Sequence, residues 1–298
     1  MINYSFIIPH HNSPILLYRC LDSIPQREDI EIIVVDDNSD ADKKPLLNRP
    51  DVKLICIDAE HTRGAGRARN YGLKEAVGKW LVFADADDFF SHDFLKVLDE
   101  HKDEDYDVIY HNTKVIDTQT LLPLKGYMKK EISIISNYNG STETSDGVRY
   151  RLNAPWWKIV KRELVEKYHI QFEEVPKGND IFFSIQVGYF ARNIIVLDIP
   201  LYFYTYNPNS ISNKKKNEEM YFCEFCTRQR LLGFYNLVGH PGWIISKTRL
   251  CVRILRHDGL FVLCRTIVKC LLNRKYLIHC VNDYVNIIHN NDKNTAIC

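Results

Sequence analysis

Short apolar segments alternate with amphipathic ones over the first ninety residues, and this alternation restricts the fold more than any other feature of the chain. The apolar segments are rich in Ile, Val and Phe and end at turn residues, as buried strands do. They cover residues 4–9, 31–35, 52–57 and 80–84. Helices are expected over 14–23 and 64–77, the second closed by Gly78 as a C-cap. The pattern predicts an α/β fold with a mostly parallel sheet, right-handed crossovers and both faces covered.

Polar residues cluster directly after each expected strand. The clusters are His10 to Asn12, Asp36 with Asp37, His61 to Asn70, and Asp85 to Asp88. Each of them, taken alone, fits a turn or a helix cap, because Asp, Asn and Ser favour both. Ligands of open parallel sheets bind beyond the carboxyl ends of the strands, and all four clusters share that edge. We therefore expect one polar crevice at this edge.

One chemistry for the crevice is dinucleotide binding. The segment from Gly64 to Arg69 reads GAGRAR, follows a strand and opens a helix, and Asp85 lies about twenty positions further along. Arg69 stands where the fingerprint has its third glycine, and two strands precede a motif that usually follows the first. The match to a dinucleotide-dependent oxidoreductase is therefore weak.

The other chemistry is a site for a metal ion and a diphosphate. Asp85 and Asp87 flank a small alanine at a strand end, and carboxylate oxygens are the ligands that Mg²⁺ and Mn²⁺ prefer. Arg67 and Arg69 lie at a helix start, where both guanidinium groups and backbone N–H groups suit a diphosphate. A metal there would neutralise charge on a departing diphosphate.

Three motifs occur in order over roughly the first hundred residues: FIIPHHN, IIVVDDNSD and RGAGRARNYGLKEAVGKWLVFADADD. With them the chain resembles a family 2 glycosyltransferase with the GT-A fold of nucleotide-diphospho-sugar transferases. The resemblance implies that Pro9, His11 and Asn12 line the nucleotide. It also implies that Asp36 or Asp37 reads the base, commonly uracil. His10 and His11 depart from the family pattern, which more often has an aromatic residue before the asparagine.

The resemblance extends to the donor sugar and the metal. It places Arg69, in the ARN segment, near the nucleotide, and we group Arg67 and Ala86 with these donor-binding residues. Asp85 and Asp87 form the DxD motif that holds Mn²⁺ or Mg²⁺ in the family.

The middle of the chain is expected to supply the acceptor side. Residues 153–162 read as a turn into a helix and resemble the family segment aP-x-x-K. Trp156 and Trp157 have two interpretations, which are core packing and a platform on which a sugar ring stacks. A strand is also expected over 107–110, and an ordered segment between loops over 132–139.

Asp180 is the candidate general base. Together with Asn179 it matches a family Glu-Asp pair, with asparagine in place of the glutamate. A carboxylate within hydrogen-bond reach of the acceptor hydroxyl would take its proton. The alternative is an N-cap for a helix running to about residue 191. An aromatic strand over 200–206 precedes Ser-Ile-Ser at 210–212, which is either a lid over the nucleotide or an ordinary loop.

The C-terminal region differs from the rest. We expect a catalytic domain over 1–212, with a nucleotide-sugar half (1–100) and an acceptor half (101–212), and a basic helical region over 213–298. Residues 243–276 hold eight Lys and Arg against one acid, Asp258, interleaved with apolar residues. This pattern is typical of a membrane-surface segment, and equally of a helical appendage with a solvated basic face.

Composition limits the function classes. Lys and Arg number 39 against 38 acids, a net charge of +1, which argues against a nucleic-acid-binding protein. No signal peptide and no apolar run of about 18 residues is apparent. We expect a cytoplasmic protein with free thiols, peripheral on the cytosolic face of a membrane if the basic region binds there. Cys223 and Cys226 form the sole CxxC and are expected to be helix thiols and not zinc ligands.

These features together predict an inverting, metal-dependent glycosyltransferase acting on a nucleotide-sugar donor and a glycan or lipid-linked acceptor. Inversion follows from the resemblance and from the single candidate base. The alternatives are a nucleotide-sugar-binding protein without activity and a sugar nucleotidyltransferase. The carboxylates argue against the first, and the missing glycine-rich N-terminal loop argues against the second.

Overall fold

The computed structural model describes residues 1–298 except 48, 59–63, 176, 208–215, 245 and 296–298. It contains two compact units. The first, which we call the sheet unit, comprises Met1–Glu174 and Asn179–Asn207. The second, the helical unit, comprises Val175–Gly178 and Pro208–Cys298. The domain boundary expected at residue 212 and the Ser-Ile-Ser segment lie outside the described residues.

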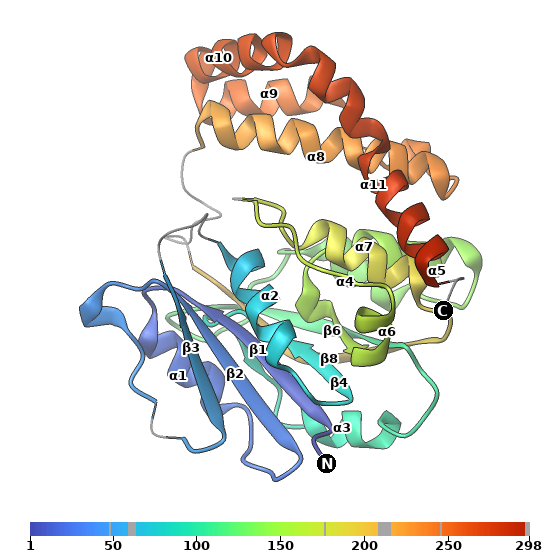
Figure 1. The fold of residues 1–298 in the computed structure, drawn as a ribbon. Helices are drawn as coiled ribbons and strands as arrows, with labels where there is room; N and C mark the ends of the chain where they lie inside the picture. The colour runs from blue at the N-terminus through green and yellow to red at the C-terminus, as the bar shows by residue number, and fades with distance from the viewer. Residues whose placement is uncertain (48, 59–63, 176, 208–215, 245, 296–298) are drawn as a thin grey trace. The chain divides into compact units, whose positions relative to one another are not determined.

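An eight-stranded sheet forms the centre of the sheet unit (Figure 1), in the order β3-β2-β1-β4-β7-β6-β8-β5. The strands are β1 (Tyr4–His10), β2 (Ile30–Asp37), β3 (Val52–Ile57), β4 (Trp80–Phe83), β5 (Phe89–Phe90), β6 (Val108–Asp117), β7 (Lys158–Lys161) and β8 (Ile194–Tyr206). The β1, β2, β3 and β4 pairs are parallel, and the four strands predicted in the first ninety residues are confirmed.

Strand β1 lies between β2 and β4, so the strand order changes direction beside it. Tyr4 pairs with Ile30 on one side and with Trp80 on the other, and His10 pairs with Asp36. The carboxyl ends of these strands consequently meet at one edge, as predicted. That edge is called the carboxyl edge below, and the opposite one the amino edge.

Burial along the strands follows their position in the sheet. β1, β2 and β4 are buried almost throughout, because neighbours cover both faces. Strand β3 forms an edge of the sheet and exposes Lys53, Leu54 and Cys56. The expectation that both faces are covered therefore fails for this strand.

Seven α-helices and two 3₁₀ turns belong to the described sheet unit. They are α1 (Pro14–Asp22), η1 (Ala41–Lys43), α2 (Ala65–Glu75), α3 (Phe94–His101), α4 (Lys129–Ser136), α5 (Thr142–Arg151), η2 (Pro155–Trp157), α6 (Arg162–Lys167) and α7 (Ile181–Phe190). The segment 132–139 is thus mostly the end of a helix. The predicted α1 and α7 are confirmed to within a residue.

Helix α2 ends three residues before Gly78, so the predicted C-cap is wrong. Ala76, in extended conformation, follows the last helical residue. Gly78 is instead required by a close approach, since a Cβ there would lie 2.6 Å from Ser5 Oγ and 2.7 Å from Ser5 N. Its own N–H donates to Ser5 Oγ at 2.8 Å.

The prediction of a helix directly after the two tryptophans is also wrong. Residues Lys158–Lys161 form strand β7, which runs antiparallel between β4 and β6. Ile159 pairs with Val82 and with Ile109, and its side chain is fully buried. Helix α6 begins only at Arg162. These residues form a strand because β4 and β6, which are distant in sequence, pair with them on both sides.

The helical unit contains α8 (Glu218–Leu237), η4 (Pro241–Trp243), α9 (Lys247–His257), α10 (Gly259–Leu272) and α11 (Arg274–Thr295). The helical pattern predicted from Met220 onward is confirmed. Tyr221 and Phe225 of α8 pack with Leu250 and Ile254 of α9 in a small core. Among the described helices, none is long and apolar enough to cross a membrane.

Candidate active site

His10, the last residue of β1, joins two strand ends. Its Nδ1 lies 2.7 Å from Asp36 Oδ1, and its Nε2 accepts a hydrogen bond from Ser13 N at 3.1 Å. Because Nε2 accepts, we assign the proton to Nδ1, which donates to the carboxylate. Ser39 donates to both oxygens of Asp36, from Oγ at 2.5 Å and from N at 3.2 Å. Burial acts to raise the pKa of Asp36, but the bonds from Ser39 and His10 outweigh it and lower that pKa.

Asp37 is the member of the acidic pair that keeps a free oxygen. Its Oδ2 accepts a hydrogen bond from Gly64 N at 2.7 Å, whereas its buried Oδ1 has no hydrogen-bond partner among the described residues. Both oxygens of Asp36 are occupied. The sequence leaves open which aspartate reads the base, and this difference favours Asp37. The assignment itself stays a prediction.

The loop after β1 lies beside Asp37 at the carboxyl edge. His11 is exposed, with Nδ1 3.0 Å from the backbone oxygen of Asp37. Asn12 has a positive φ of 55° and exchanges two hydrogen bonds with Asp40, one from Asn12 Nδ2 at 3.0 Å and one from Asp40 N at 2.8 Å. These bonds fix the loop that contains His11 and Asn12, two predicted nucleotide-lining residues; the third, Pro9, lies in β1.

The glycines at the start of α2 have backbone roles. Gly64 has φ 148°, a conformation that L side chains rarely adopt. A Cβ at Gly66 would lie 2.2 Å from Glu173 O and 2.8 Å from Asn179 Cβ, so only glycine allows this approach. Packing of α2 against the segment before α7 thus accounts for the Gly-Ala-Gly pattern without a dinucleotide.

Arg69 brings three distant segments together. Its Nη2 donates to Asp85 Oδ1 at 2.6 Å, and its Nη1 donates to Asn179 Oδ1 at 3.1 Å. Helix α2, the end of β4 and the start of α7 are therefore held at one place. Arg67 is directed elsewhere, since its Nη1 donates to Asp58 O at 3.1 Å. The structure brings Arg69 to the carboxylates and leaves Arg67 apart from them.

The Asp85–Asp88 loop is held by residues that the sequence did not single out. The backbone oxygen of Asp87 accepts hydrogen bonds from Arg19 Nη2 and from Thr205 Oγ1. The buried carboxylate of Asp88 accepts from Tyr202 Oη at 2.8 Å and from Thr205 N at 2.7 Å. Asp88 therefore binds the loop to β8. Asp85 and Asp87 remain as the two carboxylates of the loop that can face a ligand. Arg19 carries no motif, so nothing in the sequence indicates its role.

Negative charge accumulates in this loop. Burial, and then the charge of Asp85, raises the pKa of Asp87 to about 6. Burial, and then Asp87 and Asp85, raises the pKa of Asp88 well above its ordinary value. A cation would relieve this repulsion, so Asp85 and Asp87 fit Mn²⁺ or Mg²⁺ in charge and in donor type. Within the described residues, no group of three or more His, Cys, Asp or Glu side chains is placed to hold a metal ion.

Asp180 lies directly before α7, at the predicted position, but its side chain makes no capping hydrogen bond. Burial raises its pKa, Asp85 adds to that shift, and Arg69 and Lys158 oppose it. Lys158 is a buried cation that sequence reasoning missed. Its Nζ donates to Leu152 O at 2.6 Å and to Ala154 O at 3.3 Å. Burial lowers the pKa of Lys158 to about 7, against the opposing effect of Asp180.

The two tryptophans are both inside the sheet unit. Trp156 is 3% exposed and Trp157 is 1% exposed. The Trp156 ring stacks on Tyr202 with centroids 5.0 Å apart and planes 10° apart. Burial favours the core-packing interpretation, because a sugar platform needs an open ring face. Their role in acceptor binding stays a prediction.

Comparison with known families decides where the chain belongs. The model of glycosyl transferase family 2 matches residues 5–168, which is more than half of the chain and includes β1 to β4 and the Asp85–Asp88 loop. The chain belongs to glycosyl transferase family 2. The family suggested by the three sequence motifs is thereby confirmed.

Relatives within family 2 are named for sugar transfer. The glycosyltransferase GlyA of Streptococcus pneumoniae is 27% identical over 247 residues, covering 79% of this chain and 35% of GlyA. The GalNAc(5)-diNAcBac-PP-undecaprenol beta-1,3-glucosyltransferase of Campylobacter jejuni is 27% identical over 187 residues, covering 60% of this chain and 58% of that enzyme. The chain thus spans less than two thirds of either relative.

A solved structure confirms the fold. The crystal structure of Staphylococcus aureus TarS residues 1–349 in complex with UDP-GlcNAc matches with a TM-score of 0.56 and 18% identity, covering 96% of this chain and 82% of that one. At this identity the likeness shows the fold alone. The α/β sheet with its C-terminal helices is the predicted GT-A fold.

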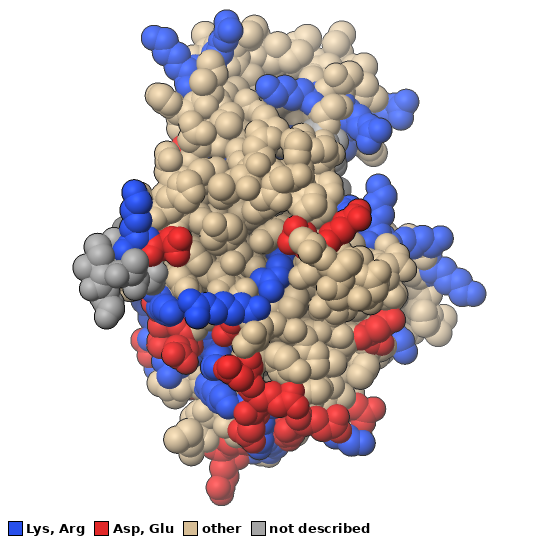
Figure 2. Space-filling model, turned by 90° about the vertical axis from the view of Figure 1, so that its right-hand side faces the viewer, with Lys and Arg blue, Asp and Glu red and all other residues tan. Residues whose placement is uncertain are grey.

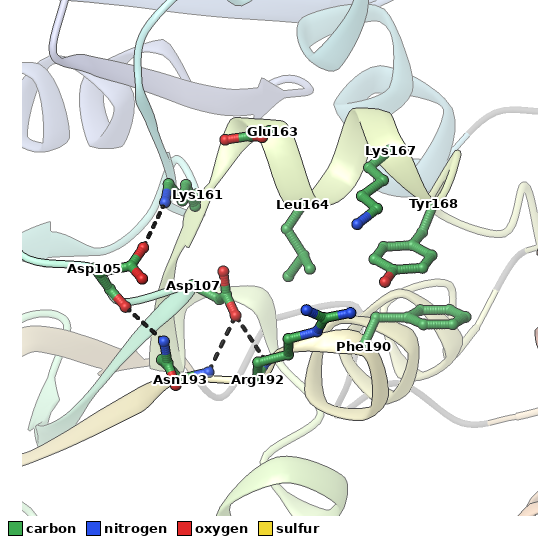
Figure 3. Close-up of a pocket in the computed structure, with 10 residues that line it drawn as sticks. All are labelled: Asp105, Asp107, Lys161, Glu163, Leu164, Lys167, Tyr168, Phe190, Arg192 and Asn193. Carbon is green, nitrogen blue, oxygen red and sulfur yellow. Dashed lines mark hydrogen bonds and ion pairs between the residues drawn. The ribbon is translucent and has the colours of Figure 1, made fainter. Parts of the chain in front are cut away.

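A hollow of about 290 Å³ lies at the amino edge, away from the family 2 motifs (Figure 3). Lys161 Nζ donates to Asp105 Oδ1 at 3.3 Å, and Asp107 Oδ2 accepts from the backbone N of Arg192 at 2.7 Å and of Asn193 at 3.1 Å. The charges of Asp105 and Lys161 are paired, and Asp107 holds backbone. The candidate site is therefore at the carboxyl edge and not at this hollow.

Proposed function

We propose that the chain transfers a sugar from a nucleotide-diphospho-sugar, most simply a UDP-sugar, to a hydroxyl of a glycan or lipid-linked saccharide. The proposal places this reaction in the cytoplasm, in the synthesis of a surface polysaccharide. The observation that carries it is that the charge of Asp85 acts on both Asp87 and Asp180 at the carboxyl edge, while Arg69 donates a hydrogen bond to Asp85. The named activities of the Campylobacter jejuni relative and of TarS support donor and acceptor classes of this kind.

The donor would bind between the ends of β1, β2 and β4. Asp37 Oδ1, buried and without a partner among the described residues, is an acceptor for the N–H of a uracil base. His11 and Asn12 lie on the adjoining loop, where they would contact the nucleotide. Ala86 is small, so the backbone between the two aspartates can approach the donor closely.

Asp85 and Asp87 would hold Mn²⁺ or Mg²⁺. The bound ion would supply positive charge for the diphosphate as it leaves. Arg69 already neutralises part of Asp85, and it orients this carboxylate from the start of α2.

Asp180 would act as the general base. Its carboxylate takes the proton from the acceptor hydroxyl, whose oxygen attacks the anomeric carbon from the side opposite the diphosphate. Such an in-line attack inverts the anomeric centre. The raised pKa of Asp180 makes it a better proton acceptor than an ordinary aspartate. Asn179, bonded to Arg69, fixes the backbone next to the base and is proposed to border the acceptor.

The test is release of UDP or GDP from a panel of nucleotide sugars with Mn²⁺ and a mixed glycan and lipid-linked acceptor pool. We expect release by the wild-type chain and a loss of roughly 10³-fold on Asp87→Asn, because several kcal/mol of charge stabilisation would be removed. EDTA should abolish release reversibly.

Asp105→Asn is the matched control, since it makes the same change at the amino edge and should leave release intact. Full release by Asp87→Asn, or in EDTA, would contradict the metal assignment. Binding of a nucleotide sugar without any release, across the panel, would favour a non-catalytic binding protein.

A further inference from the structure

Helix α10 presents an apolar stripe to solvent. Six large side chains on one side of the helix are between 40% and 82% exposed. They are Leu260, Phe261, Ile267, Val268, Leu271 and Leu272. Their spacing of three and four residues places them on one face of the helix. Single exposed apolar residues are normal, but a continuous stripe of six marks a surface that contacts something else.

The opposite face of α10 explains why the stripe is not part of the core. Val262, Leu263 and Cys270 pack against the cluster formed by α8 and α9, and Thr266 is fully buried. The helix is therefore seated in the helical unit by its other side. The stripe is left over after the unit has formed its own core, so folding of the unit does not require it.

Unpaired cations lie on the two helices that precede and follow α10 in the chain. Lys247, Arg249 and Arg256 of α9 and Arg274 and Lys275 of α11 are exposed and make no ion pair among the described residues. Figure 2 shows Lys and Arg side chains standing over the helical unit with uncharged surface between them.

The structure lowers the number of uncompensated basic residues within residues 243–276. Of the eight basic residues, Arg253, Arg265 and Lys269 pair with glutamates of α8. Their charges are therefore largely compensated. Five cations remain for an external partner.

No acid opposes these cations on α9 or α10. The one acid between the two helices, Asp258, accepts hydrogen bonds from Tyr221 Oη and from Lys216 N, so it is turned into the unit. An exposed apolar stripe together with uncompensated cations on the adjoining helices complements an anionic bilayer, whose acyl region takes the stripe and whose head groups take the cations. A second copy of the chain fits less well, because a symmetric contact would place cations against cations.

We infer that the α10 stripe and the unpaired cations of α9 and α11 form a docking face for an anionic membrane surface. The face lies wholly in the helical unit and does not depend on the reaction at the carboxyl edge. It would hold a transferase at the surface where lipid-linked acceptors are found, and to that extent it adds to the proposed function.

The test is flotation of the full chain with lipid vesicles, without substrate. One set contains phosphatidylcholine alone, and the other mixes it with phosphatidylglycerol in equal parts. We expect flotation with the mixed vesicles only, and weaker flotation as salt rises from about 0.1 M to about 1 M. Because no activity is measured, failure here is distinct from failure of the proposed transfer.

A double variant tests the apolar part of the docking face. Phe261→Ser with Leu271→Ser should lower the partition coefficient at least tenfold by removing buried apolar area. Ile15→Ser with Leu46→Ser is the matched control, because both residues are 80% exposed but lie in the sheet unit. Thermal melting should be similar for both pairs, since the changed side chains are exposed.

Charge is tested by Arg256→Gln, Arg274→Gln and Lys275→Gln together, which should also weaken flotation about tenfold. Lys44→Gln with Lys96→Gln, in the sheet unit, is the control. Absence of flotation with either vesicle set, or equal flotation with both, would overturn the inference. So would sedimentation of a dimer that Phe261→Ser with Leu271→Ser dissociates, because the stripe would then be an interface between copies.

Discussion

Both edges of the sheet carry charged side chains and use them differently. At the amino edge Asp105 pairs with Lys161, and Asp107 accepts two backbone N–H groups. At the carboxyl edge Asp87 and Asp88 repel each other and Asp85, and burial prevents water from screening them. Charges that satisfy one another stabilise a fold, whereas charges held together against their repulsion are typical of a binding or catalytic site.

The comparison shows why the hollow at the amino edge is a poor guide to function. It has the volume of a small-ligand pocket, and Tyr168 and Phe190 stack beside it with centroids 4.0 Å apart. The carboxyl edge instead has an unpartnered Asp37 oxygen and a carboxylate whose pKa is raised to about 6. In this protein, the candidate site is indicated by polar groups that lack a partner or repel one another, and not by the hollow.

After the loss expected for Asp87→Asn, the next largest effect at the carboxyl edge should come from Asp180→Asn, which keeps the shape of the side chain but cannot take a proton at neutral pH. We expect sugar transfer to fall roughly 10²-fold or more while donor binding is retained. The measurement is kcat and KM for nucleotide release together with donor affinity by calorimetry.

Glu163→Gln, at the amino edge, is the matched control for Asp180→Asn and should leave kcat unchanged. If Asp180→Asn lowers the melting temperature and leaves kcat intact, Asp180 is a structural residue before α7. The carboxyl edge would then have no assigned general base, and its contrast with the amino edge would no longer concern catalysis.

Much of this arrangement follows from the sequence, for identifiable reasons. The strands over 4–9, 31–35 and 80–84 are mostly apolar runs, and their parallel pairing places Asp36, Asp37 and Asp85 at one edge. Local chemistry could not decide between Asp36 and Asp37. That choice depends on Ser39 and His10, which occupy only the first of them.

Long-range contacts account for what the sequence could not show. Strand β7 has four residues, too few for a periodic pattern, and it exists because β4 and β6 pair with it on both sides. The same pairing buries Lys158, a residue type that is normally exposed. Arg19 reaches Asp87 from a helix 68 positions earlier in the chain.

A smaller effect, on the pH dependence of the unfolding free energy, should distinguish Lys158 from Lys161 on strand β7. Lys158 is buried with its pKa lowered to about 7, so between that pH and its ordinary pKa the unfolded chain binds one more proton than the folded chain. The free energy of unfolding should therefore rise with pH, by at most about 1.4 kcal/mol per unit, or about 2 kcal/mol from pH 7 to pH 9.

Lys158→Met should remove this slope, and chemical denaturation at each pH measures it. Lys161→Met, three residues along β7 at the amino edge, should leave the slope in place. An unchanged slope in Lys158→Met would show that the buried amine is not the group that titrates.

The smallest effect is expected at Asp107, whose carboxylate holds the backbone at the start of β8. Asp107→Ala leaves the N–H groups of Arg192 and Asn193 without their acceptor, at a cost of about 1–2 kcal/mol in unfolding free energy. Asp107→Asn should recover most of this loss, because an amide oxygen accepts from the same N–H groups. Sugar transfer should stay within twofold of wild type in both variants. A fall in kcat in Asp107→Asn at unchanged stability would mean that the amino edge takes part in the reaction, and the division between a satisfied edge and a reactive one would be wrong.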